Sequence, residues 1–185
     1  MGHHSNIALA ARVAALPQPT TTWPKWIVTG GGVGFLRPAP GSWGTVPPAI
    51  FFLLMLHYQI SDLWRNVFFI AFGMLASVLL VAWGKWAAAY FREADPGQVI
   101  LDEYAGFALT VLFVPTPVWC GNDPFRLFLF TAALYILFRA TDTLKLPPCR
   151  QLERLPWGWG ILCDDLMAGI QANIIAQIVI YLWLT

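Results

Sequence analysis

The chain has 185 residues, of which 58% are hydrophobic and only 11% are charged. Soluble globular domains carry about 25% charged residues, so this composition excludes an ordinary soluble protein and indicates a membrane protein. The formal net charge of +1 gives no sign of a nucleic-acid-binding surface. The three cysteines (Cys120, Cys149 and Cys163) have neither metal-ligand spacing nor a pairing pattern, so we expect free thiols.

The N-terminal part, residues 1–26, is predicted to be a polar arm, and we interpret Met1–Ser5 as a tag remnant. Residues 27–185 are predicted to form a single helical membrane domain. Near its start, residues 30–45 are so rich in Gly and Pro that we expect a loop rather than a helix. This loop is either a plain connector or a phosphate-binding segment that uses backbone N–H groups and the hydroxyls of Ser42 and Thr45.

Five apolar segments follow, and they predict an all-α, multi-pass membrane bundle of about five spans, because backbone polar groups in lipid must be paired within helices. The expected spans are residues 46–60, 67–90, 96–114, 125–143 and 165–184. For the third span, Asp95 is a plausible N-cap, Pro96 suits the first helical position and Gln98 completes a capping box. Asp102 and Glu103 are then expected about two turns into that helix.

The basic residues predict the orientation of the bundle. If five spans alternate, only Arg65 and Arg126 lie on one side, and the other nine of the eleven basic residues lie on the opposite side. Cytoplasmic loops carry the excess of Lys and Arg, so the richly basic side is predicted to be cytoplasmic.

Acidic residues from the third, fourth and fifth spans are expected to converge at this same side. Hard oxygen ligands suit Mg²⁺ and neighbouring cations suit a phosphate, so the pattern predicts a magnesium-dependent phosphate site. The candidate metal ligands are Asp95, Asp102, Glu103, Asp142, Asp164 and Asp165. All of these except Asp95 are also candidate catalytic residues.

Each acidic group also has a simpler interpretation. Asp102 and Glu103 could be protonated or paired with Arg139, and adjacent helical residues point about 100° apart, so we do not expect both on one ion. Asp164 and Asp165 could complement the dipole at a helix N-terminus. Arg139 and Asp142 could form a local ion pair.

The chain contains no Ser-His-Asp or Cys-His arrangement, which favours a metal-activated water as nucleophile. A direct attack by a carboxylate on phosphorus remains the alternative. We expect Arg139 and Lys145 to contact the phosphate, together with Arg150 and the Gly41–Thr45 segment.

Three blocks of this sequence resemble the phosphatidylglycerophosphatase A family. Pro40–Thr45 is similar to its P-G-T-x-G-[ST] loop, and Asp95–Gly106 is similar to its D-x-G-x-[IV]-V-x-D-E-x-x-G block. Phe138–Arg150 followed by Gly158–Gly169 is similar to its F-R-x-x-D-x-x-K-P-x-P-[IV] and G-G-x-G-[IV]-M-x-D-D-x-x-A-G blocks. The resemblance covers roughly residues 27–184.

This resemblance implies a Mg²⁺-dependent enzyme of the bacterial cytoplasmic membrane, with a helical core. The implied reaction removes the terminal phosphate of phosphatidylglycerol phosphate and yields phosphatidylglycerol and inorganic phosphate, a step of phospholipid biosynthesis. Our own hypothesis is that Gly41, Ser42, Gly44 and Thr45 contact the phosphate with the basic residues named above, while the acyl chains of the lipid substrate stay in the bilayer.

Two other classes of protein compete with this interpretation. A small ion-coupled transporter or channel would also keep intramembrane acids, but it needs them along a path to both faces. A non-catalytic module that binds anionic lipids would explain Lys145, Arg150 and Arg154 but not the acids beside them.

Overall fold

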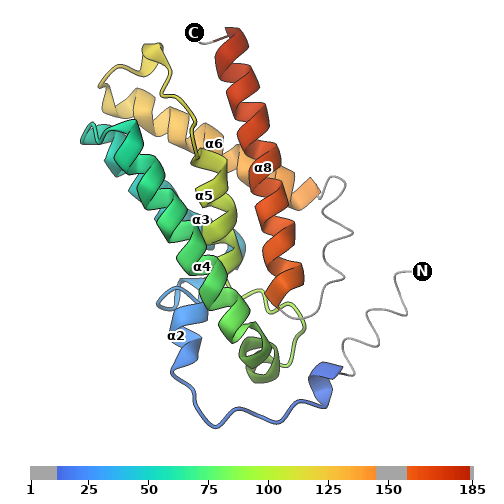
Figure 1. The fold of residues 1–185 in the computed structure, drawn as a ribbon. Coiled ribbons are helices and arrows are strands. Elements are labelled where there is room, and N and C mark those ends of the chain that lie inside the picture. Colours follow the sequence, from blue (N-terminus) through green and yellow to red (C-terminus); the bar gives the residue numbers. More distant parts are fainter. Residues whose placement is uncertain (1–11, 145–157, 184–185) are drawn as a thin grey trace.

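A computed structural model describes residues 12–144 and 158–183, and within these ranges all regular structure is helical (Figure 1). The prediction of an all-α protein is therefore confirmed. The elements in chain order are α2 (Pro24–Val28), η1 (Val33–Phe35), α3 (Pro40–His57), α4 (Asp62–Phe91), α5 (Leu101–Val111), η2 (Val118–Cys120), α6 (Pro124–Leu144) and α8 (Gly158–Trp183).

The short helix α5 lies at the centre of the bundle and packs against α3, α4, α6 and α8 (Figure 1). Nine of its residues are buried, including the side chains of Asp102 and Glu103. The apolar members of α5, such as Phe107 and Val111, belong to the main hydrophobic core. The central position of α5 explains how two acids come to lie in the interior of the protein.

Glycines allow α5 and α8 to approach closely. A Cβ atom on Gly169 would meet the backbone oxygen of Gly106, and a Cβ atom on Gly106 would lie 2.7 Å from the backbone oxygen of Asp165. Small residues at such contacts let helix backbones pack tightly in membrane proteins. The same contact brings Asp165 of α8 next to the acids of α5.

The extent of α5 differs from the prediction of a helix over residues 96–114. The helix begins at Leu101, and Asp95 does not cap it. Instead, the N–H of Val99 donates to Pro96 O at 2.9 Å and the N–H of Ile100 donates to Val28 O at 3.0 Å. This tie to α2 holds the preceding segment in a turn, so the two acids lie in the first helical turn rather than two turns inside.

The Gly-rich segment also differs from the prediction. Gly30, Gly31 and Gly32 have positive φ angles and do form a loop, but α3 already begins at Pro40 and includes Gly41–Thr45. A Cβ atom on Gly44 would lie 2.8 Å from Ile100 Cβ. This glycine therefore serves a close helix contact rather than a turn.

Three helices are long and apolar enough to cross a membrane: α4, α6 and residues Gly158–Leu182 of α8. Among the described residues, α3 and α5 are not in this group, so five overstates the number of long crossing helices. With 11 residues, α5 is about 16 Å long, whereas the hydrocarbon core is about 30 Å thick. The protein is nevertheless a multi-pass membrane protein by these three helices.

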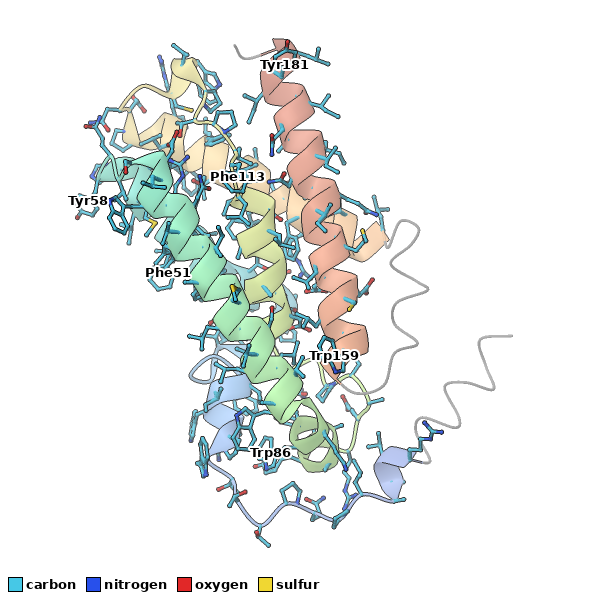
Figure 2. The ribbon with its side chains drawn as sticks, in the orientation of Figure 1. Phe51, Tyr58, Trp86, Phe113, Trp159 and Tyr181 are labelled. Atoms are coloured by element: carbon cyan, nitrogen blue, oxygen red, sulfur yellow. The ribbon has the colours of Figure 1, made fainter. Side chains whose placement is uncertain are left out.

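Aromatic side chains mark both ends of the bundle. Figure 2 shows Trp86 and Trp159 toward the end where α8 begins, and Tyr181 at the opposite end of that helix. Exposed aliphatic residues, among them Met74 and Val78 on α4 and Ile178 on α8, lie between these ends. Apolar side chains between two aromatic belts are typical of a surface that faces lipid.

Candidate active site

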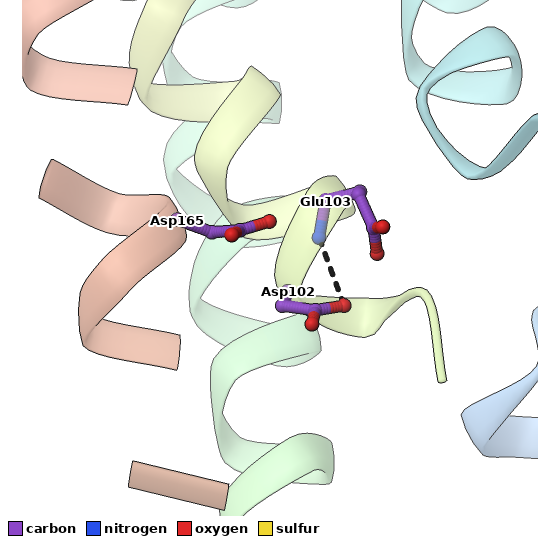
Figure 3. A group of neighbouring side chains, drawn as sticks. All are labelled: Asp102, Glu103 and Asp165. Atoms are coloured by element: carbon purple, nitrogen blue, oxygen red, sulfur yellow. Dashed lines mark hydrogen bonds between the residues drawn. The ribbon is translucent and has the colours of Figure 1, made fainter. Parts of the chain in front are cut away.

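Five of the six predicted metal-binding acids come together from three helices. Asp102, Glu103 and Asp165 each offer one carboxylate oxygen, and these oxygens all lie within 4.8 Å of one another. We name this group the first trio (Figure 3). Asp142, Asp164 and Asp165 meet the same distance limit and form the second trio. We call the five residues together the acid layer.

The first trio corrects one expectation. Asp102 and Glu103 are adjacent on α5 and were expected to point too far apart to serve one ion. The structure brings one oxygen of each into the same trio, and the N–H of Glu103 donates to Asp102 Oδ1 at 3.1 Å (Figure 3). Both acids lie in the first turn of α5, and Asp165 approaches them from α8. One oxygen of each of the three carboxylates can therefore lie close to the others.

The start of α8 differs from the prediction. Asp164 and Asp165 were expected to open the last helix, but α8 begins at Gly158, so both acids lie about two turns inside it. The helix dipole acts mainly within the first turn and does not account for them. A Cβ atom on Gly158 would lie 2.7 Å from Leu80 O, so this glycine packs α8 against α4 rather than forming a tight loop.

The acid layer is buried. Asp102, Glu103, Asp164 and Asp165 are each at most 9% exposed. Burial, followed by repulsion from Glu103, raises the pKa of Asp102 well above its ordinary value. Burial also raises the pKa of Glu103 to about 7, although Asp102 and Arg139 lower it. Both acids lie on α5, which is too short to span the bilayer. A bound cation would favour the charged forms of both carboxylates.

One carboxylate oxygen of Glu103 has no hydrogen-bond partner in the part of the chain that the structure describes. Its Oε2 atom is buried and has no hydrogen-bond partner among the described residues. Leaving a buried carboxylate oxygen unpaired is costly. Oxygen ligands of this kind suit Mg²⁺, so the residues present fit the metal that the sequence predicted.

The Arg139 guanidinium borders the acid layer. Arg139 Nη1 lies 3.0 Å from Asp142 Oδ2, which confirms the local ion pair considered as an alternative. A Cβ atom on Gly41 would meet Glu103 Oε1 and would lie 3.1 Å from Arg139 Nη2. The first turn of α3 therefore contacts one acid and the guanidinium at the same time.

The start of α3 carries backbone N–H groups that have no backbone acceptor among the described residues. Pro40 has no N–H, the N–H of Trp43 donates to Ala39 O at 3.1 Å, and the N–H groups of Gly41 and Ser42 have no intrahelical acceptor. Helix N-termini bind anions through such groups and through the helix dipole. The segment predicted as a phosphate loop thus lies beside the acids, but as a helix start.

Two other predicted phosphate contacts, Gly44 and Thr45, are engaged in helix packing. Thr45 is fully buried and its hydroxyl donates to Gly41 O at 2.9 Å, and Gly44 packs on Ile100. Asp95 is exposed and belongs to neither trio, although its charge contributes to the raised pKa of Asp102. Lys145 and Arg150 lie outside the described residues. The roles of these residues stay predictions.

Tyr135 is a site-supporting residue that the sequence analysis missed. It lies on α6 one turn before Arg139, and its hydroxyl donates to Ser42 O at 3.1 Å. This bond ties the start of α3 to the helix that carries Arg139 and Asp142. The i,i+4 spacing of Tyr135 and Arg139 was the available signal, because it places both on one helix face.

Three features together define the class of protein. They are the membrane-crossing helices, the buried acid layer, and the Arg139 guanidinium with the start of α3 at the edge of that layer. They are typical of an integral membrane hydrolase that acts on phosphate esters. The comparisons with known proteins agree with this class.

The sequence model of the family described as phosphatidylglycerophosphatase A matches residues 26–180. The chain belongs to this family and is therefore a lipid phosphatase. It is 30% identical over 156 residues to a Haemophilus influenzae protein named phosphatidylglycerophosphatase A, covering 84% of this chain and 87% of that protein. It is 28% identical over 147 residues to the Escherichia coli protein of the same name, covering 78% of this chain and 76% of that protein.

A relative with a different name is as similar. The chain is 30% identical over 161 residues to a Bacteroides thetaiotaomicron protein named "Putative phosphatidylinositol-3-phosphatase", covering 84% of this chain and 92% of that protein. No solved structure matches the chain significantly.

Proposed function

We propose that the protein hydrolyses the terminal phosphate of phosphatidylglycerol phosphate in a Mg²⁺-dependent reaction and thereby yields phosphatidylglycerol and inorganic phosphate. This is a step of phospholipid biosynthesis at the bacterial cytoplasmic membrane, with the active site facing the cytoplasm. The observation that carries the proposal is the convergence of five carboxylates from three helices beside Arg139 and the start of α3. The names of two relatives support the choice of substrate.

The acid layer would hold the metal. Its carboxylates are hard oxygen donors, and the buried Glu103 Oε2 atom has no hydrogen-bond partner among the described residues. When bound there, Mg²⁺ supplies charge neutralisation at the phosphate and activation of a water molecule. Asp95 was also predicted as a ligand, and its exposed position beside Asp102 suits a more peripheral role.

Arg139 and the first turn of α3 would bind the phosphate. A guanidinium can donate two parallel hydrogen bonds to phosphate oxygens, and the N–H groups of Gly41 and Ser42 can donate further ones. The ion pair with Asp142 holds Arg139 at the edge of the acid layer before substrate arrives. Lys145 and Arg150 are proposed to add positive charge from the cytoplasmic side.

The carboxylates would also move the protons. In the proposed step, a water oxygen bonds to phosphorus while the bond from phosphorus to the glycerol oxygen breaks. The attacking water gives its proton to a carboxylate of the acid layer, and the leaving glycerol oxygen takes up a proton from that carboxyl group or from solvent water. Glu103 is one such carboxylate, because its buried Oε2 atom has no hydrogen-bond partner among the described residues.

Phosphate release by the purified protein in detergent tests the proposal. The substrates are phosphatidylglycerol phosphate, phosphatidic acid and phosphatidylinositol 3-phosphate, each with Mg²⁺ and with EDTA. We expect release from the first substrate only, and only with Mg²⁺. Release from phosphatidylinositol 3-phosphate alone would refute the proposed substrate and favour the one in the name of the Bacteroides relative. Release in EDTA would refute the metal dependence.

The transporter alternative is less well supported. The acids that converge do so in one layer, whereas a transport path needs polar groups that continue to the opposite face. Absence of phosphate release from every lipid, with cation flux in proteoliposomes, would favour the transporter.

A further inference from the structure

We propose that the acid layer holds two divalent cations, one in each trio, with the Asp165 carboxylate between them. The inference rests on the proposed function, because it concerns the same carboxylates. It adds the number of ions and the assignment of residues to each.

The first argument is the division of the acid layer into two groups. The first trio combines α5 with α8, and the second trio combines α6 with α8. Asp165 is the one residue common to both, and its carboxylate has two oxygens. One carboxylate can therefore serve a separate ion with each oxygen, which is a usual way to join two metals about 3.5–4 Å apart.

The second argument is the distance within each trio. Mg²⁺ binds its oxygen ligands at about 2.0–2.1 Å, so two ligands on opposite sides of an ion lie about 4 Å apart. Three oxygens within 4.8 Å of one another need only small side-chain movements to reach that geometry. Both trios meet this distance condition.

The third argument is charge. As metal ligands all five carboxylates would be ionised and carry −5, and the Arg139 guanidinium paired with Asp142 contributes +1, which leaves −4. One divalent cation would leave −2 in a layer where four of the acids are at most 9% exposed. Two divalent cations bring this sum to zero, and uncompensated charge in a buried place is strongly unfavourable.

An independent observation points to a ligand in the first trio. Glu103 is about nine-tenths buried and offers a carboxylate oxygen to this trio, and its Oε2 atom lacks a hydrogen-bond partner among the described residues. In the second trio, Asp142 forms an ion pair with Arg139. The two trios therefore have different neighbouring groups.

Arg139 connects the two proposed ion sites with the substrate. It forms an ion pair with Asp142 of the second trio. Its guanidinium and the Glu103 carboxylate of the first trio both lie next to Gly41. A phosphate bound by Arg139 and the start of α3 would thus border both sites. Two-metal sites in phosphate chemistry stabilise the attacking and the leaving oxygen in this way.

Mn²⁺ binding by the full-length protein in detergent tests the inference, because Mn²⁺ has Mg²⁺-like ligand preferences and an electron paramagnetic resonance signal. After EDTA treatment and removal of the chelator, we expect two Mn²⁺ ions per chain with a spin-coupled spectrum. Asp142→Asn and Asp102→Asn should each reduce binding from two ions to one and abolish the coupling. The matched control is Glu93→Gln, an exposed acid outside both trios, which should keep two coupled ions.

The outcomes separate the two proposals. One uncoupled Mn²⁺ per wild-type chain would overturn the two-ion inference, and the proposed function would stand if lipid phosphate release still required Mg²⁺. Two coupled ions without hydrolysis of any lipid phosphate would leave the inference standing and refute the proposed function. Circular dichroism and thermal unfolding establish that each variant folds. If a variant does not fold, the number of Mn²⁺ ions bound per wild-type chain still decides between one ion and two.

Discussion

The replacement Gly41→Ala tests the contact between the start of α3 and the acid layer. The new methyl group would meet Glu103 Oε1 and would lie 3.1 Å and 3.4 Å from the two terminal nitrogens of Arg139. These atoms are the ends of flexible side chains, so we expect them to move, by up to about 1 Å for the Glu103 carboxylate, rather than to unfold the helix. The change thus displaces a proposed metal ligand and the proposed phosphate ligand together.

The expected result is a loss of activity without a loss of stability. Displacements approaching 1 Å can cost about 10²-fold in rate, which corresponds to about 2.7 kcal/mol of transition-state stabilisation. Ala is favoured over Gly in helices by up to about 1 kcal/mol, so the thermal unfolding temperature should stay equal or rise. We would measure kcat/KM for phosphate release from phosphatidylglycerol phosphate, and thermal unfolding in the same detergent.

Gly97→Ala is the matched control. Gly97 lies at the same end of the protein, and the nearest atom to a Cβ there is Pro40 Cγ at 3.9 Å. This variant should keep wild-type kcat/KM. Wild-type activity in Gly41→Ala, or an equal loss in Gly97→Ala, would refute the reasoning.

Three further predictions concern single residues. Asp165→Asn should abolish turnover, while the metal-free protein unfolds at the same or a higher temperature, because one of several repelling buried charges is removed; measurable turnover near the wild-type rate would contradict this. Arg139→Lys keeps the charge but loses the planar fork, so KM should rise about tenfold or more; an unchanged KM would exclude Arg139 as a phosphate contact. Asn173→Ala removes an amide that donates to Leu109 O, Thr110 O and Leu112 O at 3.1, 3.0 and 2.7 Å. It should lower the free energy of unfolding by about 1–3 kcal/mol, and an unchanged thermal unfolding temperature would speak against this role.

The sequence was sufficient for the helical class and for the long helices. Continuous apolar segments with few charges predicted α4, α6 and α8, because their length and hydropathy depend on local composition alone. The convergence of acids from three helices also followed from the order of the segments. Of the six acids expected in this layer, Asp95 alone belongs to neither trio.

The start of α5 could not be predicted in the same way. Asp95, Pro96 and Gln98 form a good local capping pattern, but the hydrogen bond from Ile100 N–H to Val28 O competes with it. That acceptor is more than seventy residues earlier in the chain. Tertiary contacts of this kind override local capping preferences.

The glycines of α3 were misinterpreted for a similar reason. A glycine that allows a turn and one that allows close approach look identical in a sequence. Gly41 and Gly44 are close to Glu103, Arg139 and Ile100, which lie on distant segments. The sharing of one trio by Asp102 and Glu103 likewise depends on Asp165, and Asp165 reaches them through the Gly106–Gly169 contact.

The dependence of α5 on α8 has a consequence for how the protein is made. Since α5 is too short to cross the bilayer, its final carbonyl groups need a donor inside the protein, and Asn173 supplies one. Asn173 and both aspartates of α8 are synthesised after every other helix described here. A growing chain can therefore insert α4 and α6 early, but the last carbonyl groups of α5 gain the Asn173 donor, and the acid layer gains its two aspartates of α8, only after α8 has been made.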